Sequence, residues 1–465
     1  MATGGETRAL VDFARGLEWR DLPDDVRETL GVLFLDFLRV SSMGARLPWA
    51  DWARGYIGKV AAPGASHVLF AGERLNPQHA TFLNVAYGSS FDADDTHVGA
   101  MIHSGIAAWS AGLAAGEEAG ARGPEIVAAV LAAYEAAIRI SFAMQPGHFH
   151  RGFQATGTCN VFGTALAAGR LLLGGAEAGN RMADAMGLAA NYAGGLAQFY
   201  HTGGSAKRIQ AAHGAQCGVA SVLLVREGFT GPSEILEGKA GFLQAYSDEC
   251  HPERITDRLG EVFHVRDVLV KGYAAAARVH SAMEGMFDLR LAHGFSAEDI
   301  EHLTIGIPKV IEGRLTKPEP ADEQAAQMSL PFSVALAAAV PLQPGAIPVV
   351  TIADYLERID DPSLKPLQAK METKIDPDVE AASGAQSTAA KLVLTLRGGR
   401  MVETFVAAPK GSASRPFTRA EHEARFRQEL ATRISDANCQ AVIAISRDLE
   451  RLDAARLAAL LAPSG

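Results

Sequence analysis

Apolar residues in the first 270 positions recur mainly every three or four residues, the spacing of helices with one buried face. A first long helix is predicted to begin near Asp24, after Leu22-Pro23. One face of this helix then carries the apolar residues Val26, Leu30, Leu33, Phe34 and Phe37. The ranges 124–138, 161–173 and 206–225 predict further helices, and their many small residues allow close helix packing. The pattern therefore predicts a helical core.

Strand-like alternation of apolar and polar residues replaces the helical spacing after about Ser296. Residues 303–307 alternate and end at a proline, which predicts a strand. Residues 391–396 and 401–406 alternate on either side of a Gly-Gly pair, which predicts a β-hairpin. Residues 335–340 and 418–461 return to helical spacing.

This change of period predicts a mainly α protein with an α+β insert. We place a helical domain at residues 1–270, an α+β domain at 271–411, and C-terminal helices at 412–465 that return to the helical domain. We expect the strands to be confined to the insert. A length of 465 residues agrees with more than one domain, because single cores rarely grow beyond roughly 250–300 residues.

The composition is that of an ordinary globular protein, with 48% hydrophobic and 21% charged residues. The formal net charge is -10, and the chain has no basic run or basic stripe with interleaved aromatics, so we expect no nucleic-acid partner. No apolar run approaches the roughly 18 residues of a membrane span, and the N-terminus has no apolar signal region. We therefore expect a cytoplasmic protein without a membrane partner.

The four cysteines are too scattered to suggest a cofactor site or a disulfide framework. Cys159, Cys217, Cys250 and Cys439 form no CxxC pair and no Cys/His spacing typical of zinc or of an iron–sulfur cluster. We expect no metal.

The densest group of reactive side chains is Asp92-Ala93-Asp94-Asp95-Thr96-His97, followed by His103. Carboxylates and imidazoles at such density are costly to bury unless they are paired, so they suggest proton transfer. Two lysines, Lys207 in Gly-Gly-Ser-Ala-Lys-Arg and Lys271 in Val-Lys-Gly-Tyr, could bind an anionic substrate. The alternatives are a hydrated loop, solvated lysines, and a magnesium or calcium site. The last is disfavoured because the loop lacks a wider set of oxygen ligands.

These residues belong to a series of motifs that resembles the MmgE/PrpD family, which includes 2-methylcitrate dehydratase, cis-aconitate decarboxylase and iminodisuccinate epimerase. The resemblance runs nearly end to end. Its motifs are Asp92–His97 with His103, Gly152–Thr158, Ala206-Lys207-Arg208, Glu227–Pro232, Leu236-Glu237-Gly238, Lys271–His280, Ser329–Phe332 and Pro409-Lys410-Gly411.

The resemblance implies a large all-helical domain built from both chain ends, a smaller α+β lid domain, an active site between them, and a homodimer. It also implies catalysis without a cofactor. The family's catalytic positions fall on Asp92, Thr96, His103, Lys207 and Lys271. Further substrate-binding candidates are Gln154, Arg208, His97 and Phe332.

Three positions depart from the family pattern. Gln154 stands where the family usually has histidine, and Gln210 where relatives often have it. Phe332 stands where the family often has tyrosine. Glutamine forms hydrogen bonds but exchanges no proton near neutral pH. Nearby His148 and His150 are possible substitutes.

The residues together predict a lyase, a dehydratase or decarboxylase, that acts on a small di- or tricarboxylate. His103 would move a proton next to a substrate carboxylate, while the lysines neutralise negative charge. Dehydration, decarboxylation and epimerisation share a carbanion-like species, so the residues do not choose between them. The alternatives are an epimerase or isomerase of a small dicarboxylate, and a non-catalytic carboxylate-binding protein.

Overall fold

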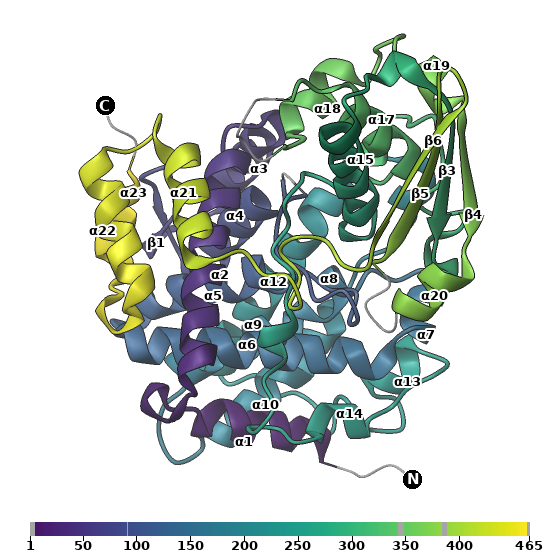
Figure 1. Ribbon diagram of the computed structural model, residues 1–465. Coiled ribbons are helices and arrows are strands. Elements are labelled where there is room, and N and C mark those ends of the chain that lie inside the picture. The colour runs from purple at the N-terminus through teal and green to yellow at the C-terminus, as the bar shows by residue number, and fades with distance from the viewer. Residues whose placement is uncertain (1–4, 91, 343–347, 384–387, 463–465) are drawn as a thin grey trace. The chain divides into compact units, whose positions relative to one another are not determined.

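The computed structural model describes residues 5–90, 92–342, 348–383 and 388–462 (Figure 1). The chain forms two compact units. The first contains Met1–Ala197, Lys207–Val268 and Thr418–Gly465, and the second contains Gln198–Ala206 and Leu269–Phe417. The predicted fold class, mainly α with an α+β part, is confirmed.

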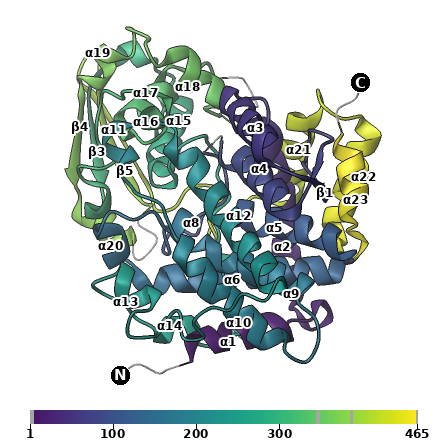
Figure 2. The same ribbon diagram turned by 180° about the vertical axis from the view of Figure 1, so that it is seen from behind.

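Helices from both ends of the chain build the first unit. Its longer helices are α1 (Glu6–Gly16), α2 (Asp24–Gly44), α3 (Pro48–Val60), α4 (Pro77–Ser89), α5 (Gly105–Ala119), α6 (Gly123–Met144), α9 (Asn160–Leu172), α10 (Ala178–Ala189), α12 (Ala206–Arg226), α21 (Arg419–Leu430), α22 (Asp436–Arg447) and α23 (Ala454–Leu461). Its short helices are α7 (Gly147–His150), α8 (Ala155–Thr158), α13 (Phe242–Tyr246) and α14 (Glu253–Thr256). Figures 1 and 2 show C-terminal α21 and α22 beside α2, and α1 beside α10.

Helix α6 is the centre of this unit and packs against α5 and α9. It is long and apolar enough to cross a membrane, contrary to the expectation that no such segment exists, but 94% of its most apolar window is buried inside the fold. Its ion pair between Glu135 and Arg139 is fully buried, with 3.1 Å between Oε2 and Nε. Arg139 also donates to the carbonyl oxygens of Ile255, Asp257 and Val262. The helix therefore holds the segment that leads to residue 268.

One part of the first unit differs from the expected all-helical structure. Strands β1 (Pro63–His67) and β2 (Arg74–Leu75) form an antiparallel ribbon. The expectation that strands occur only in the insert is therefore wrong for this ribbon. It is short and irregular, with a register shift between Pro63 and Ser66, so it leaves no alternating pattern in the sequence.

The second unit contains a four-stranded sheet in the order β4-β3-β5-β6. The strands are β3 (Ile300–Ile307), β4 (Met371–Ile375), β5 (Ala390–Leu396) and β6 (Arg400–Val406). The β5–β6 hairpin is confirmed, and Gly398 and Gly399 turn it with left-handed φ angles of 84° and 79°. Strand β4, which pairs in parallel with β3, was not predicted. It is a mostly exposed edge strand without the apolar alternation that marks β5.

Helix α15 (His280–His293) packs against β5, β6 and α17 (Leu330–Ala339) (Figure 1). The unit also contains α11 (Phe199–Thr202), α16 (Glu323–Gln327), α18 (Ile352–Arg358), α19 (Lys365–Gln368) and α20 (Pro377–Ser383). Segment Gln198–Ala206 belongs to this unit, although the sequence placed it in the helical domain. The reason is local: α11 packs against α16, and the Gly204 N–H donates to Asp322 at 2.5 Å.

Candidate functional site

The acidic loop, defined here as Asp92–His103, connects α4 and α5 within the first unit. Asp92 and Met101 have left-handed φ angles of 51° and 54°, which are uncommon for residues with a side chain. His97 and Ile102 exchange backbone hydrogen bonds of 2.9 and 3.4 Å. Such strain persists only where surrounding contacts hold it, and it clusters at functional sites. The loop is therefore held in one defined conformation.

Asp92 and Lys207 form a buried ion pair. Lys207 lies in the first turn of α12, and its Nζ is 2.5 Å from Asp92 Oδ1. The lysine side chain is 10% exposed and the aspartate side chain 1%. An ammonium group has three donors, so Lys207 can bind a further carboxylate while it keeps this contact. The structure thus brings two of the predicted catalytic residues together, although they are 115 positions apart.

The ring of His103 is oriented by two oxygen atoms. Nδ1 lies 3.0 Å from the Asp95 carbonyl oxygen and 3.3 Å from Asp94 Oδ2. Both are acceptors, so Nδ1 carries the ring proton and Nε2 holds the lone pair. The His103 backbone is fixed as well, because its N–H donates to Thr156 Oγ1 and its carbonyl accepts from Asn160. These contacts fix the orientation of the His103 ring, while its role in proton transfer stays a prediction.

Asp95 anchors the loop to the core. Its carboxylate accepts from the Tyr134 hydroxyl at 2.6 Å and from the Gly105 N–H at 3.0 Å, at the start of α5. A Cβ at residue 105 would collide with both the Asp95 carboxylate and the Tyr134 hydroxyl, so this approach requires glycine. Burial raises the pKa of Asp95 to about 7 despite these donors.

Thr96 and Arg208 are both in contact with backbone oxygens. The Thr96 hydroxyl donates to the Ile102 carbonyl at 3.1 Å and closes the acidic loop. Arg208 donates to the Ser90 carbonyl at 2.6 Å, and its guanidinium lies 3.8 Å from the centre of the Trp49 ring. These contacts hold the start and the end of the loop, while direct substrate contacts of Thr96 and Arg208 stay a prediction.

Gln154 is linked to His103 through Thr156, and Gln210 lies close to Gln154. Gln154 Oε1 accepts from the Thr156 N–H at 3.3 Å, and the Thr156 hydroxyl holds the His103 backbone. Gln210 Nε2 donates to the Leu196 carbonyl at 2.8 Å. A Cβ at Gly195 would lie 3.3 Å from the Gln154 carbonyl and 3.6 Å from Gln210 Oε1. The two amides therefore lie close to the same glycine, Gly195.

His148 does not replace the missing imidazole. Its Nδ1 lies 3.1 Å from the Tyr246 carbonyl, and its Nε2 lies 2.8 Å from Thr158 Oγ1. Burial lowers its pKa to about 4, and its ring stacks on Phe153. Both nitrogens are thus engaged in packing α7 against α8. His150 is exposed at the end of α7.

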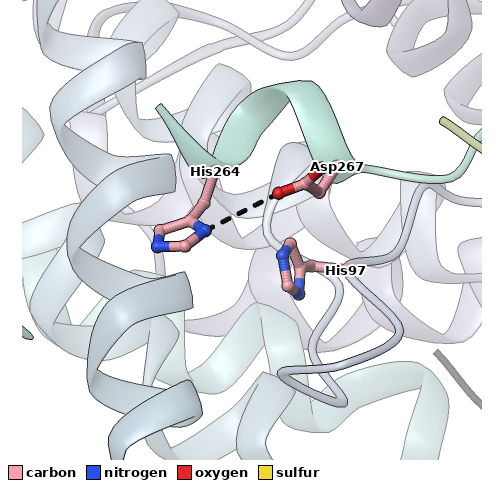
Figure 3. A group of neighbouring side chains, drawn as sticks. All are labelled: His97, His264 and Asp267. Atoms are coloured by element: carbon pink, nitrogen blue, oxygen red, sulfur yellow. Dashed lines mark ion pairs between the residues drawn. The ribbon is translucent and has the colours of Figure 1, made fainter. Parts of the chain in front are cut away.

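His97 points to a different neighbourhood from Asp92 and His103. Its Nδ1 accepts from the Ala100 N–H at 3.0 Å, and its ring packs edge-on against Phe142 and His264. Figure 3 shows His97 with His264 and Asp267, which lie on one short 3-10 turn of the first unit. Burial lowers the pKa of His97 to about 4, so its imidazole is neutral at physiological pH. The geometry thus does not support His97 as a neighbour of the Asp92–Lys207 pair.

Lys271 and Phe332 belong to the second unit. Lys271 is buried in a segment that runs beside residues 409–411, with Val270 N–H donating to the Gly411 carbonyl at 2.9 Å. Phe332 is a buried core residue of α17, and its ring lies 5.9 Å from that of Tyr355. The expectation that these residues share a cleft with Lys207 stays a prediction.

Two arginines of the second unit were missed by the sequence analysis. Arg278 follows Lys271 by seven residues, and burial lowers its pKa to about 10. Arg314 and Tyr200 are close enough to shift that pKa in opposite directions. The position of Arg278 inside the Lys271–His280 motif was the one available signal. Arg278 is thus a buried cationic group of the second unit besides Lys271.

Comparison with known proteins identifies the family of this chain. The model of the MmgE/PrpD N-terminal domain matches residues 8–255, and the model of the MmgE/PrpD C-terminal domain matches residues 273–451. A cis-aconitate decarboxylase of Aspergillus terreus is 27% identical over 356 residues, which is 72% of this chain and 72% of the relative.

Two longer matches extend over nearly the whole chain. The cis-aconitate decarboxylase-like protein oryM of Aspergillus oryzae is 26% identical over 93% of this chain and 92% of its own. The cis-aconitate decarboxylase of Homo sapiens is 23% identical over 96% of this chain and 92% of its own. Because the two domain models together match most of its length, the chain belongs to the MmgE/PrpD family.

Proposed function

We propose that this protein is a cofactor-independent lyase that acts on a small di- or tricarboxylate. The observation that carries the proposal is the orientation of His103, whose Nδ1 faces the Asp95 carbonyl and the Asp94 carboxylate. Such a ring accepts and returns a proton near neutral pH. The Asp92–Lys207 pair in the same loop region adds a cation for a substrate carboxylate.

The proposed chemistry passes through a carbanion-like species next to a carboxylate. Its negative charge is delocalised into that carboxylate, where a lysine ammonium stabilises it. Two unit charges about 4 Å apart interact by roughly 4 kcal/mol at an effective dielectric constant of 20. Lys207 would supply one such interaction, and Lys271 and Arg278 are the residues of the second unit that we propose to supply others.

Among the lyase reactions, we favour decarboxylation over dehydration. In decarboxylation the C–C bond breaks, its electron pair stays on carbon, and one protonated group then delivers a proton to that carbon. Dehydration requires a base for the C–H proton and also an acid for the departing hydroxyl. The region around Gln154 and Gln210 offers amides, which supply no proton. His103, once solvent has protonated its Nε2, can deliver the single proton that the first reaction needs.

The test is a panel of citrate-, aconitate- and iminosuccinate-type acids incubated with the protein in deuterium oxide and followed by NMR. We expect one of these acids to lose carbon dioxide, with deuterium at the carbon that is reprotonated, or to lose water, a reaction without a reprotonation step. The His103→Gln variant is the control and should lose this signal. Deuterium exchange or inversion without elimination would identify an epimerase. Binding without any reaction would identify a non-catalytic carboxylate-binding protein, and either result would overturn the proposal.

We also propose a homodimer, the assembly expected for this family. Light scattering after size-exclusion chromatography tests it, and a mass of one chain at working concentration would refute it.

A further inference from the structure

Three side chains of the first unit that are typical metal ligands, His97, His264 and Asp267, converge outside the proposed catalytic region (Figure 3). One ligand atom from each lies within 4.8 Å of the other two. His264 Nδ1 and Asp267 Oδ2 are 3.8 Å apart. We propose that these three residues bind a divalent transition-metal ion, with Zn²⁺ as the probe.

The donor set suits such an ion. Two imidazoles and one carboxylate are common ligands of zinc and of other first-row metals, and three protein ligands leave at least one position for water. Zinc bonds of about 2.0–2.2 Å place neighbouring ligand atoms about 3.3 Å apart, so the group must contract slightly. Asp267 permits this movement because its side chain is 49% exposed.

The turn that carries His264 and Asp267 is held in place without a metal. Val265 N–H donates to Glu135 Oε1 at 3.0 Å, and Arg266 forms two contacts of 2.6 and 2.8 Å with Asp25. The contact with Asp25 also neutralises the guanidinium of Arg266, which would otherwise repel a cation. The two ligands of this turn are therefore preorganised next to the acidic loop.

His97 supplies the second, independent observation. Its Nε2 is buried and has no hydrogen-bond partner within the described part of the chain. Buried polar atoms are almost always satisfied, so this nitrogen points to a missing partner. Its other nitrogen accepts from the Ala100 N–H, so the proton of the neutral, metal-free ring lies on Nε2.

Coordination through Nε2 moves that proton to Nδ1. The Ala100 contact must then open, because two N–H groups would face each other. One hydrogen bond is exchanged for a coordinate bond. Metal binding is thus linked to a local and measurable change at Ala100.

The bound ion would be a tether between two segments. His97 belongs to the acidic loop, while Asp267 precedes Lys271 by only four residues. An ion held by both would fix the acidic loop to the segment that leads into the second unit. Its role would be structural or regulatory, and the catalytic proposal does not depend on it.

The first experiment measures zinc binding by calorimetry on the full-length, metal-stripped protein, with a competing chelator. We expect one equivalent of Zn²⁺ and a rise in Tm of at least about 2 °C, because the ion binds the folded state. His264→Ala and Asp267→Asn should each weaken binding by at least tenfold while the fold is retained. His251→Ala removes a histidine that is 46% exposed outside this group and is the matched control, with unchanged binding.

The second experiment follows hydrogen exchange at Ala100 and the absorption spectrum of bound Co²⁺. Zinc should increase exchange at the Ala100 amide, and Co²⁺ should give d–d bands that His264→Ala abolishes. The proposal is overturned if His264→Ala binds zinc as tightly as the wild type, if several equivalents bind weakly, or if no binding occurs. Unchanged exchange at Ala100 would exclude coordination by His97 Nε2.

Discussion

Two adjoining regions of the first unit differ in their capacity to move protons. Around the acidic loop, Asp92 pairs with Lys207, and Asp94 and the Asp95 carbonyl orient His103. Around Gln154 and Gln210, amides hydrogen-bond to the backbone instead. Thr156 joins the two regions, because it contacts both Gln154 and the backbone of His103. The comparison predicts that proton transfer, as proposed above, occurs on the His103 side of the site.

The sharpest test of this asymmetry is removal of the imidazole. His103→Gln should lower kcat by about two to four orders of magnitude, the usual contribution of general acid–base catalysis. The Tm should stay near the wild-type value, because glutamine can still donate to the Asp95 carbonyl. His251→Ala, which removes an exposed histidine, should leave both quantities unchanged. Equal activity of wild type and His103→Gln would mean that another group moves the proton.

The second prediction concerns the buried ion pair. Lys207→Met removes the ammonium that lies 2.5 Å from Asp92, and it should lower the free energy of unfolding by about 3–5 kcal/mol. Urea unfolding measures this change. Lys207→Met with Asp92→Asn should recover part of the stability, since no charge is left in the pair, but none of the activity. Lys239→Met, at an exposed lysine, is the control. A similarly small loss of stability in Lys207→Met and Lys239→Met would refute the prediction.

The third prediction tests whether the anchor of the acidic loop depends on pH. Asp95 has a pKa near 3.9 when unfolded and about 7 when folded, so the folded state holds its proton more tightly. The contribution of Asp95 to the stability of the folded state therefore becomes less favourable as the pH rises from about 4 to 7. Asp95→Asn removes this dependence. The free energy of unfolding of the variant, relative to that of the wild type, should therefore rise by at least about 1.4 kcal/mol between pH 4.5 and pH 8. Parallel stability curves in urea unfolding would contradict the raised pKa.

The smallest expected effect concerns the amide region. Gln154→His introduces a group that transfers protons and should raise activity on citrate-type substrates about tenfold, a fraction of the usual general-acid contribution. The readout is kcat/KM across the acid panel. Gln154→Asn is the control, since it changes the side chain without adding a titratable group. Rapid 2-methylcitrate dehydration by the wild type would show that a histidine at position 154 is dispensable.

Much of the fold could be predicted because periodicity reports which face of an element is buried. The helices α2 and α12 and the β5–β6 hairpin were visible for this reason. Strand β4 was not, because it is an exposed edge strand, and the β1–β2 ribbon was too short and irregular. The burial of α6 also needed the structure, because its apolar composition alone fits a membrane span equally well.

The sequence by itself predicted the candidate site. Asp92, His103 and Lys207 were predicted from their residue types and from the resemblance that their motifs carry. Only the tertiary structure decided what these side chains contact. It directed His97 away from Lys207 to His264, and it oriented His103 with Nε2 as its base. The physical reason is that a side chain's partner depends on backbone turns and on residues more than a hundred positions away, which local pattern does not encode.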